Sequence, residues 1–213
     1  FAADMTAPDM AHGRVLRAAV SPETGSRPAA WNLQAARAVP GFVAVAESGM
    51  FRLGASQGLG IVAETPGALD RIAEALDTEW KIDAEEPPEI ATAIDIDRVD
   101  AEPSHSLADD GIAGDRRWHV DLRLDVPAAA HGGIEPRAAL AVPSDGGMAV
   151  WTGTQDAFYV RDVLARGLGL AADRVTVHAA RAGGAFGART ICTVEAEAAA
   201  LAQALQALVQ EEP

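Results

Sequence analysis

The sequence predicts an α+β fold in which two structured segments are joined by an acidic stretch. Residues 1–82 alternate short strand patterns with helical patterns, and residues 116–213 do the same and end in an alanine-rich helical pattern. Residues 83–115 contain Pro87-Pro88, many acids and few large apolar side chains. We therefore expect one domain over residues 1–82, a solvated linker over 83–115 and a second structured part over 116–213.

The first segment is predicted to contain several strands and a short helix. Apolar or alternating runs between glycines and prolines predict strands at 10–20, 42–46, 51–53 and 59–63. Residues 31–39 have a helical pattern that ends at Pro40-Gly41.

A second helix is predicted to begin at Thr65-Pro66. A hydroxyl side chain is a good N-cap, and proline is favoured at the first helical position, where its missing N–H would have no partner in any case. Apolar residues then recur at helical spacing and define one face: Leu69, Ile72, Ala73, Leu76 and Trp80.

The second structured segment opens with a regular strand pattern. Within 116–126, apolar residues alternate with polar ones, which predicts a half-buried strand: Trp118, Val120, Leu122, Leu124 and Val126. Two more strands, 137–142 and 148–152, flank a turn at Ser144-Asp145-Gly146-Gly147.

A helix, a strand and a final helix complete this segment. Residues 156–167 predict a helix that directs Val160, Val163 and Leu164 inward and is capped by Gly169. Residues 174–180 predict a strand, and the alanine-rich residues 193–208 predict a helix.

The composition excludes several functions. The net charge of −14 argues against binding to nucleic acid or to anionic lipid, both of which need a basic surface. No apolar run reaches the ~18 residues that would cross a bilayer. The single cysteine, Cys192, excludes an intrachain disulfide, and the five histidines lack ligand spacing, so we expect no metal ligand. No nucleophile motif indicates a hydrolase.

Three short stretches of the second segment form the candidate site. They are His131-Gly132-Gly133-Ile134-Glu135-Pro136-Arg137, Trp151-Thr152-Gly153-Thr154-Gln155 and Gly183-Gly184-Ala185-Phe186-Gly187. Glycines between a strand and a helix allow positive φ and bring a ligand close to bare N–H donors, which suits a phosphate or a metal oxo group. The loop matches neither the dinucleotide motif nor the P-loop, and a tight turn without a ligand is the alternative.

Gln155 and Glu135 are the polar candidates in these stretches. The Gln155 amide can donate and accept, which suits an oxo ligand on one side, although capping of the next helix is the alternative. Glu135 is held extended by Pro136 and can pair with Arg137 or Arg189, in which case its role is structural.

The three stretches resemble, in order and approximate spacing, segments of the large subunits of the xanthine dehydrogenase/aldehyde oxidase family. "HGGIEPRAALAV" resembles the family's H-x-x-(M/I)-E-P-x-x-x-x-A segment, "WTGTQ" its (S/T)-x-Q segment, and "RVTVHAARAGGAFGAR" its strand and G-G-x-F-G-(G/A)-(K/R) loop. "FAADMTAPDMAHGRVLRA" resembles the start of the family's α/β-hammerhead domain. The resemblance covers nearly the whole chain and is greatest to the isoquinoline and nicotinate oxidoreductases. It implies an α/β-hammerhead domain at 1–82 and the N-terminal lobe of a molybdopterin-binding domain at 116–213.

The resemblance implies roles for the matched residues. Gln155 would hydrogen-bond an oxo ligand of molybdenum, and the Phe186 N–H would contact the metal end of the cofactor. Gly184, Ala185 and Gly187 would complete this cofactor-binding loop. Thr190 stands where xanthine-oxidising members carry a substrate-orienting glutamate, which favours another N-heterocycle or an aldehyde. The family's catalytic glutamate lies near the far end of the subunit, so no catalytic residue is expected here.

The resemblance also implies a cofactor and partners. The cofactor is the molybdopterin-type molybdenum cofactor, in its cytosine dinucleotide form, and water supplies the oxygen for hydroxylation. Two [2Fe–2S] clusters on a partner subunit take the electrons, since one cysteine cannot ligate them. Both chain ends resemble the interior of a longer sequence, so we expect an inactive fragment that binds the remainder of the large subunit or itself through uncovered apolar surface. Any export signal would precede Phe1, so the sequence is compatible with the cytoplasm and the periplasm.

A second hypothesis belongs to another functional class. A cofactor-free binding or scaffold module could keep the same fold. The molybdenum content of the intact subunit distinguishes the two hypotheses.

Overall fold

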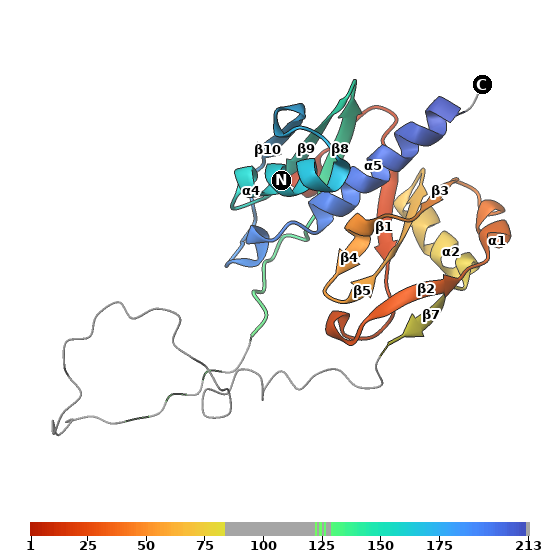
Figure 1. Cartoon of the computed structure of the whole chain (residues 1–213), viewed down its shortest axis with the longest axis horizontal. Coiled ribbons are helices and arrows are strands. Elements are labelled where there is room, and N and C mark those ends of the chain that lie inside the picture. The colour runs from red at the N-terminus through yellow and green to blue at the C-terminus, as the bar shows by residue number, and fades with distance from the viewer. Residues whose placement is uncertain (84–121, 123, 125, 127–128, 212–213) are drawn as a thin grey trace. The chain divides into compact units, whose positions relative to one another are not determined.

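The computed structural model describes residues 1–83, 122, 124, 126 and 129–211. The described residues in 1–83 and 131–211 pack into one compact unit of mixed strands and helices (Figure 1). This confirms the predicted mixed class. Within these residues, no helix is long and apolar enough to cross a membrane.

This unit contains both β-strands and α-helices. Its strands are β1 (His12–Leu16), β2 (Ser26–Ala30), β3 (Phe42–Ala46), β4 (Arg52–Leu53), β5 (Ser56–Gln57), β6 (Leu59–Ala63), β7 (Glu79–Ile82), β8 (Ala139–Ser144), β9 (Gly147–Thr152) and β10 (Val175–Ala179). Its α-helices are α1 (Leu33–Arg37), α2 (Pro66–Leu76), α4 (Ala157–Leu168) and α5 (Val194–Glu211). Short 3-10 turns lie at Ala2–Asp4, Pro22–Thr24, Gly49–Phe51, Ala172–Arg174 and Ala188–Thr190.

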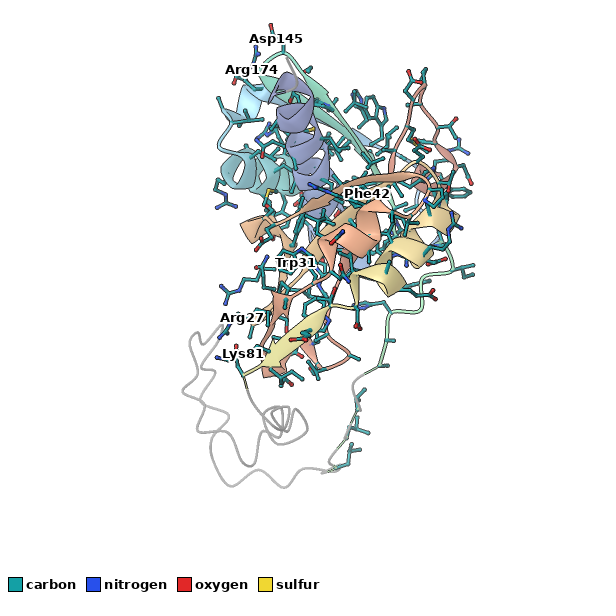
Figure 2. The ribbon with its side chains drawn as sticks, turned by 90° about the vertical axis from the view of Figure 1, so that its right-hand side faces the viewer. Arg27, Trp31, Phe42, Lys81, Asp145 and Arg174 are labelled. Atoms are coloured by element: carbon teal, nitrogen blue, oxygen red, sulfur yellow. The ribbon has the colours of Figure 1, made fainter. Side chains whose placement is uncertain are left out.

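An antiparallel sheet in the order β1–β6–β3 forms the centre of the first half. Every residue of β6 is buried, because both faces of this central strand are covered. Leu59, Ile61 and Ala63 pack against α1 and α2. Trp31 and Phe42 border the same core (Figure 2). The opposite face, which carries Val62, packs against α5.

Helix α2 begins where the sequence predicts. The Thr65 hydroxyl accepts a hydrogen bond from the N–H of Ala68 at 3.3 Å, and the predicted face is buried or half-buried up to Leu76. The helix ends there because Asp77 adopts a left-handed conformation, with a φ of 43°. Trp80, which we expected on the helix, therefore lies in β7, although it still packs against the same core.

The ribbon formed by β2 and β7 was not predicted. Pro28 lies inside β2, where it cannot donate to a ladder, and the register shifts between Pro28 and Ala30. Arg27 lies opposite Lys81 in this ribbon (Figure 2). Asp83 offsets the like charges by pairing with Arg27 at 2.8 Å.

Phe51 is also placed differently from the prediction. It ends the 3-10 turn Gly49–Phe51 instead of starting a strand, because the Ser48 hydroxyl caps this turn by accepting from the N–H of Met50. The Phe51 side chain is completely buried. The strand that follows is confirmed only for Arg52 and Leu53.

The second sheet has the order β10–β9–β8. β8 and β9 form the predicted hairpin, in which Gly146 has a φ of 65°. Arg174 closes this turn by donating to the carbonyls of Asp145 and Gly146, the latter at 2.8 Å (Figure 2). β9 continues through α4 to the parallel strand β10. Asp156 caps the start of α4, and Gly169 caps its end with a φ of 69°, as the glycine predicts.

Helix α5 packs against both sheets (Figure 1). Ala196 and Ala199 belong to the core that α4 forms with the second sheet. Leu201 enters the core of the first sheet at two glycines that leave room for it. A Cβ atom added at Gly13 or Gly60 would lie 2.7 Å from a Leu201 methyl group. The two halves therefore share one helix, and Arg17 also joins them by pairing with Glu197 at 2.6 Å.

Most of the predicted linker and of the predicted strand 116–126 lies outside the described residues. Leu122, Leu124 and Val126 are described, and none of them is in a strand. Their exposed fractions are 60%, 81% and 84%, so the prediction that they are half-buried is wrong. The domain boundaries at residues 82 and 115 stay predictions.

Candidate functional site

The three predicted stretches meet at one buried side chain, Arg189. Its Nη1 donates to the Gly153 carbonyl at 3.2 Å, its Nε to the Gly184 carbonyl at 3.2 Å and its Nη2 to the Glu135 carbonyl at 3.0 Å. The side chain is only 3% exposed. Arg189 therefore fixes the relative positions of segments that are far apart in the sequence.

Glu135 pairs with Arg189, one of the two partners that the sequence allowed. Arg189 Nη2 lies 3.0 Å from Glu135 Oε2, and the glutamate side chain is 8% exposed. The same oxygen accepts from the N–H of Gly183 at 2.6 Å, while the N–H of Glu135 donates to the Gly183 carbonyl at 3.2 Å. The prediction of a structural ion pair is confirmed, and the pair also holds the start of the glycine loop, which we define as residues 183–187.

The glycine loop has an unusual backbone. Gly184, Phe186 and Gly187 have φ values of 90°, 51° and 94°, and Phe186 is the one non-glycine among them. Among the described residues, no hydrogen bond uses the N–H groups of residues 184–187. Successive N–H groups in a loop of mixed-handed backbone form a concave site for an anion or an oxo group. The Phe186 side chain itself is exposed.

Gln155 lies beside the turn that follows this loop. Its N–H donates to the Arg189 carbonyl at 3.1 Å, and the Thr154 hydroxyl donates to the same carbonyl at 3.3 Å. The Gln155 side chain is exposed. The cap of α4 is Asp156, whose carboxylate accepts from the N–H of Tyr159 at 2.9 Å, so capping does not account for Gln155.

Thr190 and His131 border the other side of the loop. The exposed Thr190 side chain donates its hydroxyl hydrogen to the Gly187 carbonyl at 2.7 Å. A Cβ atom at Gly187 would lie 3.6 Å from the His131 ring, so the imidazole lies close to the loop backbone. His131 belongs to one of the three stretches of the candidate site, but no role of its own was predicted for it from the sequence.

A second buried network lies behind the site, on the first turn of α5. Glu195 is 1% exposed and accepts from the Thr152 hydroxyl at 2.7 Å, from Arg137 at 3.1 Å and from the N–H of Thr193 at 3.1 Å. No pattern in the sequence indicated this network, because glutamate in an alanine-rich helix is usually exposed.

Cys192 lies next to this network, and its reactivity is predicted to be low. Burial, aided by the charge of Glu195, raises the pKa of the Cys192 thiol to about 12. Because the thiolate is the nucleophile, alkylation at pH 8 should be on the order of 10³-fold slower than in the urea-unfolded chain. Folding raises this pKa above its ordinary value of ~8.5. The free energy of unfolding should therefore decrease as the pH rises from ~8.5 toward 12, because the thiol loses its proton first in the unfolded chain. An equal alkylation rate in the folded and the unfolded protein would contradict the predicted low reactivity of Cys192.

Among the described residues, no group of three or more histidine, cysteine or acidic side chains is arranged to hold a metal ion. The donors available here are instead the backbone N–H groups of the glycine loop, and Gln155 in the neighbouring segment has an exposed side-chain amide.

The chain is similar in sequence to one of the subunits of nicotinate dehydrogenase from Pseudomonas putida. The two are 28% identical over 212 residues, which cover 95% of this chain and 17% of that protein. The chain therefore spans about a sixth of this relative's length. This similarity agrees with the nicotinate oxidoreductase branch indicated by the motifs.

Solved structures share the fold. Quinoline 2-oxidoreductase from Pseudomonas putida 86 matches with a TM-score of 0.68 and 18% identity, over 96% of this chain and 31% of that one. Aldehyde oxidoreductase from Desulfovibrio gigas matches with a TM-score of 0.62 and 18% identity, over 93% of this chain and 26% of that one.

A family model identifies the chain directly. The model of the molybdopterin cofactor-binding domain matches residues 86–211, more than half of the sequence. This match agrees with the resemblance to the xanthine dehydrogenase/aldehyde oxidase large subunits that the three motifs carry. The chain belongs to the family of molybdopterin cofactor-binding domains.

Proposed function

We propose that this chain forms part of the cofactor site of a molybdenum hydroxylase large subunit, which oxidises an N-heterocycle or an aldehyde with water as the oxygen source. The observation that carries the proposal is the run of N–H groups at residues 184–187, which have no partner among the described residues. This run leads into the turn at Arg189, whose carbonyl accepts from the N–H of Gln155. An oxo-bearing group accepts hydrogen bonds and needs donors of this kind.

The residues present fit such a group. Gly184 lies close to Gly133, because a Cβ atom added at Gly184 would lie 3.7 Å from the Gly133 Cα. A side chain at position 184 would therefore fill the space beside the loop backbone. In this proposal Gly184, Ala185, Phe186 and Gly187 bind the cofactor through N–H groups, and Gln155 donates its amide hydrogen to an oxo ligand. The molybdenum cofactor, in its cytosine dinucleotide form, supplies the oxidation chemistry when bound.

The substrate class rests on Thr190 and on the relatives. Thr190 offers a small hydroxyl in place of a carboxylate, and this hydroxyl is engaged with Gly187, so it cannot orient xanthine as a glutamate would. Two relatives are named for the N-heterocycles nicotinate and quinoline. An N-heterocycle is therefore our first choice of substrate, ahead of an aldehyde.

The proposed partners are inferred from large apolar side chains that are exposed within the three stretches or close to them in the sequence. Ile134, Phe158, Phe186 and Ile191 are large, apolar and exposed. Exposed apolar surface of this kind marks contact sites with other protein. We assign this surface to the remainder of the large subunit and the electron acceptors to [2Fe–2S] clusters on a partner subunit. The first 82 residues form an α/β-hammerhead domain in this proposal, and the chain alone is inactive.

The molybdenum content of the intact large subunit tests the proposal. The subunit would be produced with its iron–sulfur partner in molybdenum-replete medium, and molybdenum per protein would be measured by elemental analysis. About one molybdenum atom per subunit is expected. Molybdenum-free protein that keeps its fold would instead favour a scaffold module.

Gln155→Ala gives the sharper test of the site. Turnover should fall roughly 10- to 100-fold, because an oriented hydrogen bond to the cofactor is lost while the fold is kept. Gln34→Ala is the matched control, since Gln34 is an exposed glutamine on α1 outside the site. Equal turnover in both variants would defeat the role of Gln155.

A further inference from the structure

We propose that Arg189 is a positioning residue that holds the glycine loop so that its N–H groups stay free for the cofactor. The inference rests on the proposed function and adds a residue to it. Arg189 does not need to touch the cofactor, because it acts through the backbone that it binds.

The orientation of the loop follows from the carbonyl that Arg189 holds. In a trans peptide the C=O and the N–H of one unit point in opposite directions. The Gly184 carbonyl accepts from Arg189 Nε at 3.2 Å, so the N–H of Ala185 points away from the guanidinium. The Gly183 carbonyl is held by the N–H of Glu135 at 3.2 Å, which turns the N–H of Gly184 away from Glu135 in the same manner. Two of the free N–H groups are therefore set by the Arg189–Glu135 pair.

The same side chain joins the loop to the segment that carries Gln155. Arg189 Nη1 binds the Gly153 carbonyl at 3.2 Å, and the Arg189 carbonyl accepts from the N–H of Gln155 at 3.1 Å. A shift of Arg189 would thus move both groups of donors relative to each other. Glu135 keeps the guanidinium in place and neutralises its buried charge.

Lysine cannot replace this arrangement. A guanidinium is a planar fork that reaches several carbonyls at once, whereas an ammonium group is a single point on a flexible stem. Arg189→Lys would keep the positive charge near Glu135 but would release at least one of the carbonyls of Gly153 and Gly184. The loop would then lose its fixed orientation without losing the ion pair.

The test compares two lysine variants in the intact large subunit with its partner. Arg17→Lys is the matched control outside the site, because Arg17 pairs with Glu197 at 2.6 Å and donates to a single carbonyl, that of Phe51, at 3.1 Å. Molybdenum retained per protein after gel filtration and the unfolding temperature would be measured for each. Arg189→Lys should retain about tenfold less molybdenum than Arg17→Lys at a similar unfolding temperature.

Each outcome bears on the inference. Equal molybdenum retention in the two lysine variants would overturn the role of Arg189 while leaving the proposed function in place. Wild-type protein without molybdenum would overturn both. If Arg189→Lys does not fold, Glu135→Gln provides the readout. It removes the negative charge that anchors the guanidinium and keeps one oxygen that can accept from Arg189 and from the N–H of Gly183. Lowered molybdenum retention supports the inference, and wild-type retention overturns it.

Discussion

Leu201→Ala is expected to lower the free energy of unfolding by about 3 kcal/mol, the size found for leucines removed from well-packed cores. Leu201 is buried at the point where α5 enters the core of the first sheet, together with Phe51 and Val62. Removing its methyl groups leaves a cavity that the rigid strands on either side of Gly13 and Gly60 cannot close. Urea denaturation followed by circular dichroism measures the loss.

Two alanine substitutions at the glycines sharpen this test. At Gly13 an added Cβ clashes only with Leu201, at 2.7 Å, whereas at Gly60 it also lies 2.7 Å from the Phe51 ring. Gly13→Ala should cost about 1 kcal/mol alone and much less when combined with Leu201→Ala, because the new methyl group fills part of the cavity. Gly60→Ala should stay costly in the same combination. Losses at Gly13 and Leu201 that add to within about 0.5 kcal/mol would show that the two residues do not interact.

Glu195→Ala should destabilise the protein by about 4 kcal/mol. The substitution removes the acceptor of three hydrogen bonds and leaves the partly buried Arg137 without a counter-charge. Both the free energy of unfolding in urea and the midpoint of thermal unfolding report the effect.

Glu197→Ala is the matched control on the same helix. Glu197 makes one ion pair, with Arg17, and both side chains are about one-fifth exposed. Its loss should be about 1 kcal/mol. Similar losses in the two variants would mean that the buried Glu195 network contributes no more than the partly exposed Arg17–Glu197 pair.

Elements with local chemical signals could be predicted from the sequence. Thr65-Pro66 starts a helix, Asp145-Gly146 closes a hairpin and Gly169 ends a helix, because each residue type suits the backbone at its own position. These signals need no knowledge of the rest of the chain.

Elements set by tertiary packing could not be predicted in this way. β2 contains a proline and forms only because β7 lies beside it. Trp80 continues the helical spacing, but Asp77 turns the chain before it. Leu122, Leu124 and Val126 alternate in the sequence like residues of a strand, yet they are exposed and lie outside any strand.

The sequence predicts which short motifs belong to the candidate site, but it does not predict how these motifs are arranged in space. Gln155 and the glycine loop were singled out by residue type and by resemblance, and the structure joins the Gln155 backbone to Arg189, in the turn that follows the loop. The convergence of three carbonyls on Arg189 depends on three-dimensional contacts between distant segments, so no local pattern could reveal it.

The position of α5 in the chain order has a consequence for biosynthesis. The strands of the first sheet are all translated by residue 63, but the face that carries Val62 is covered only in part, by Phe51, until Leu201 has been added. At typical rates of elongation this delay is on the order of 10 s. During that time the nascent protein presents an apolar surface, and we expect ribosome-associated chaperones to occupy it until α5 emerges.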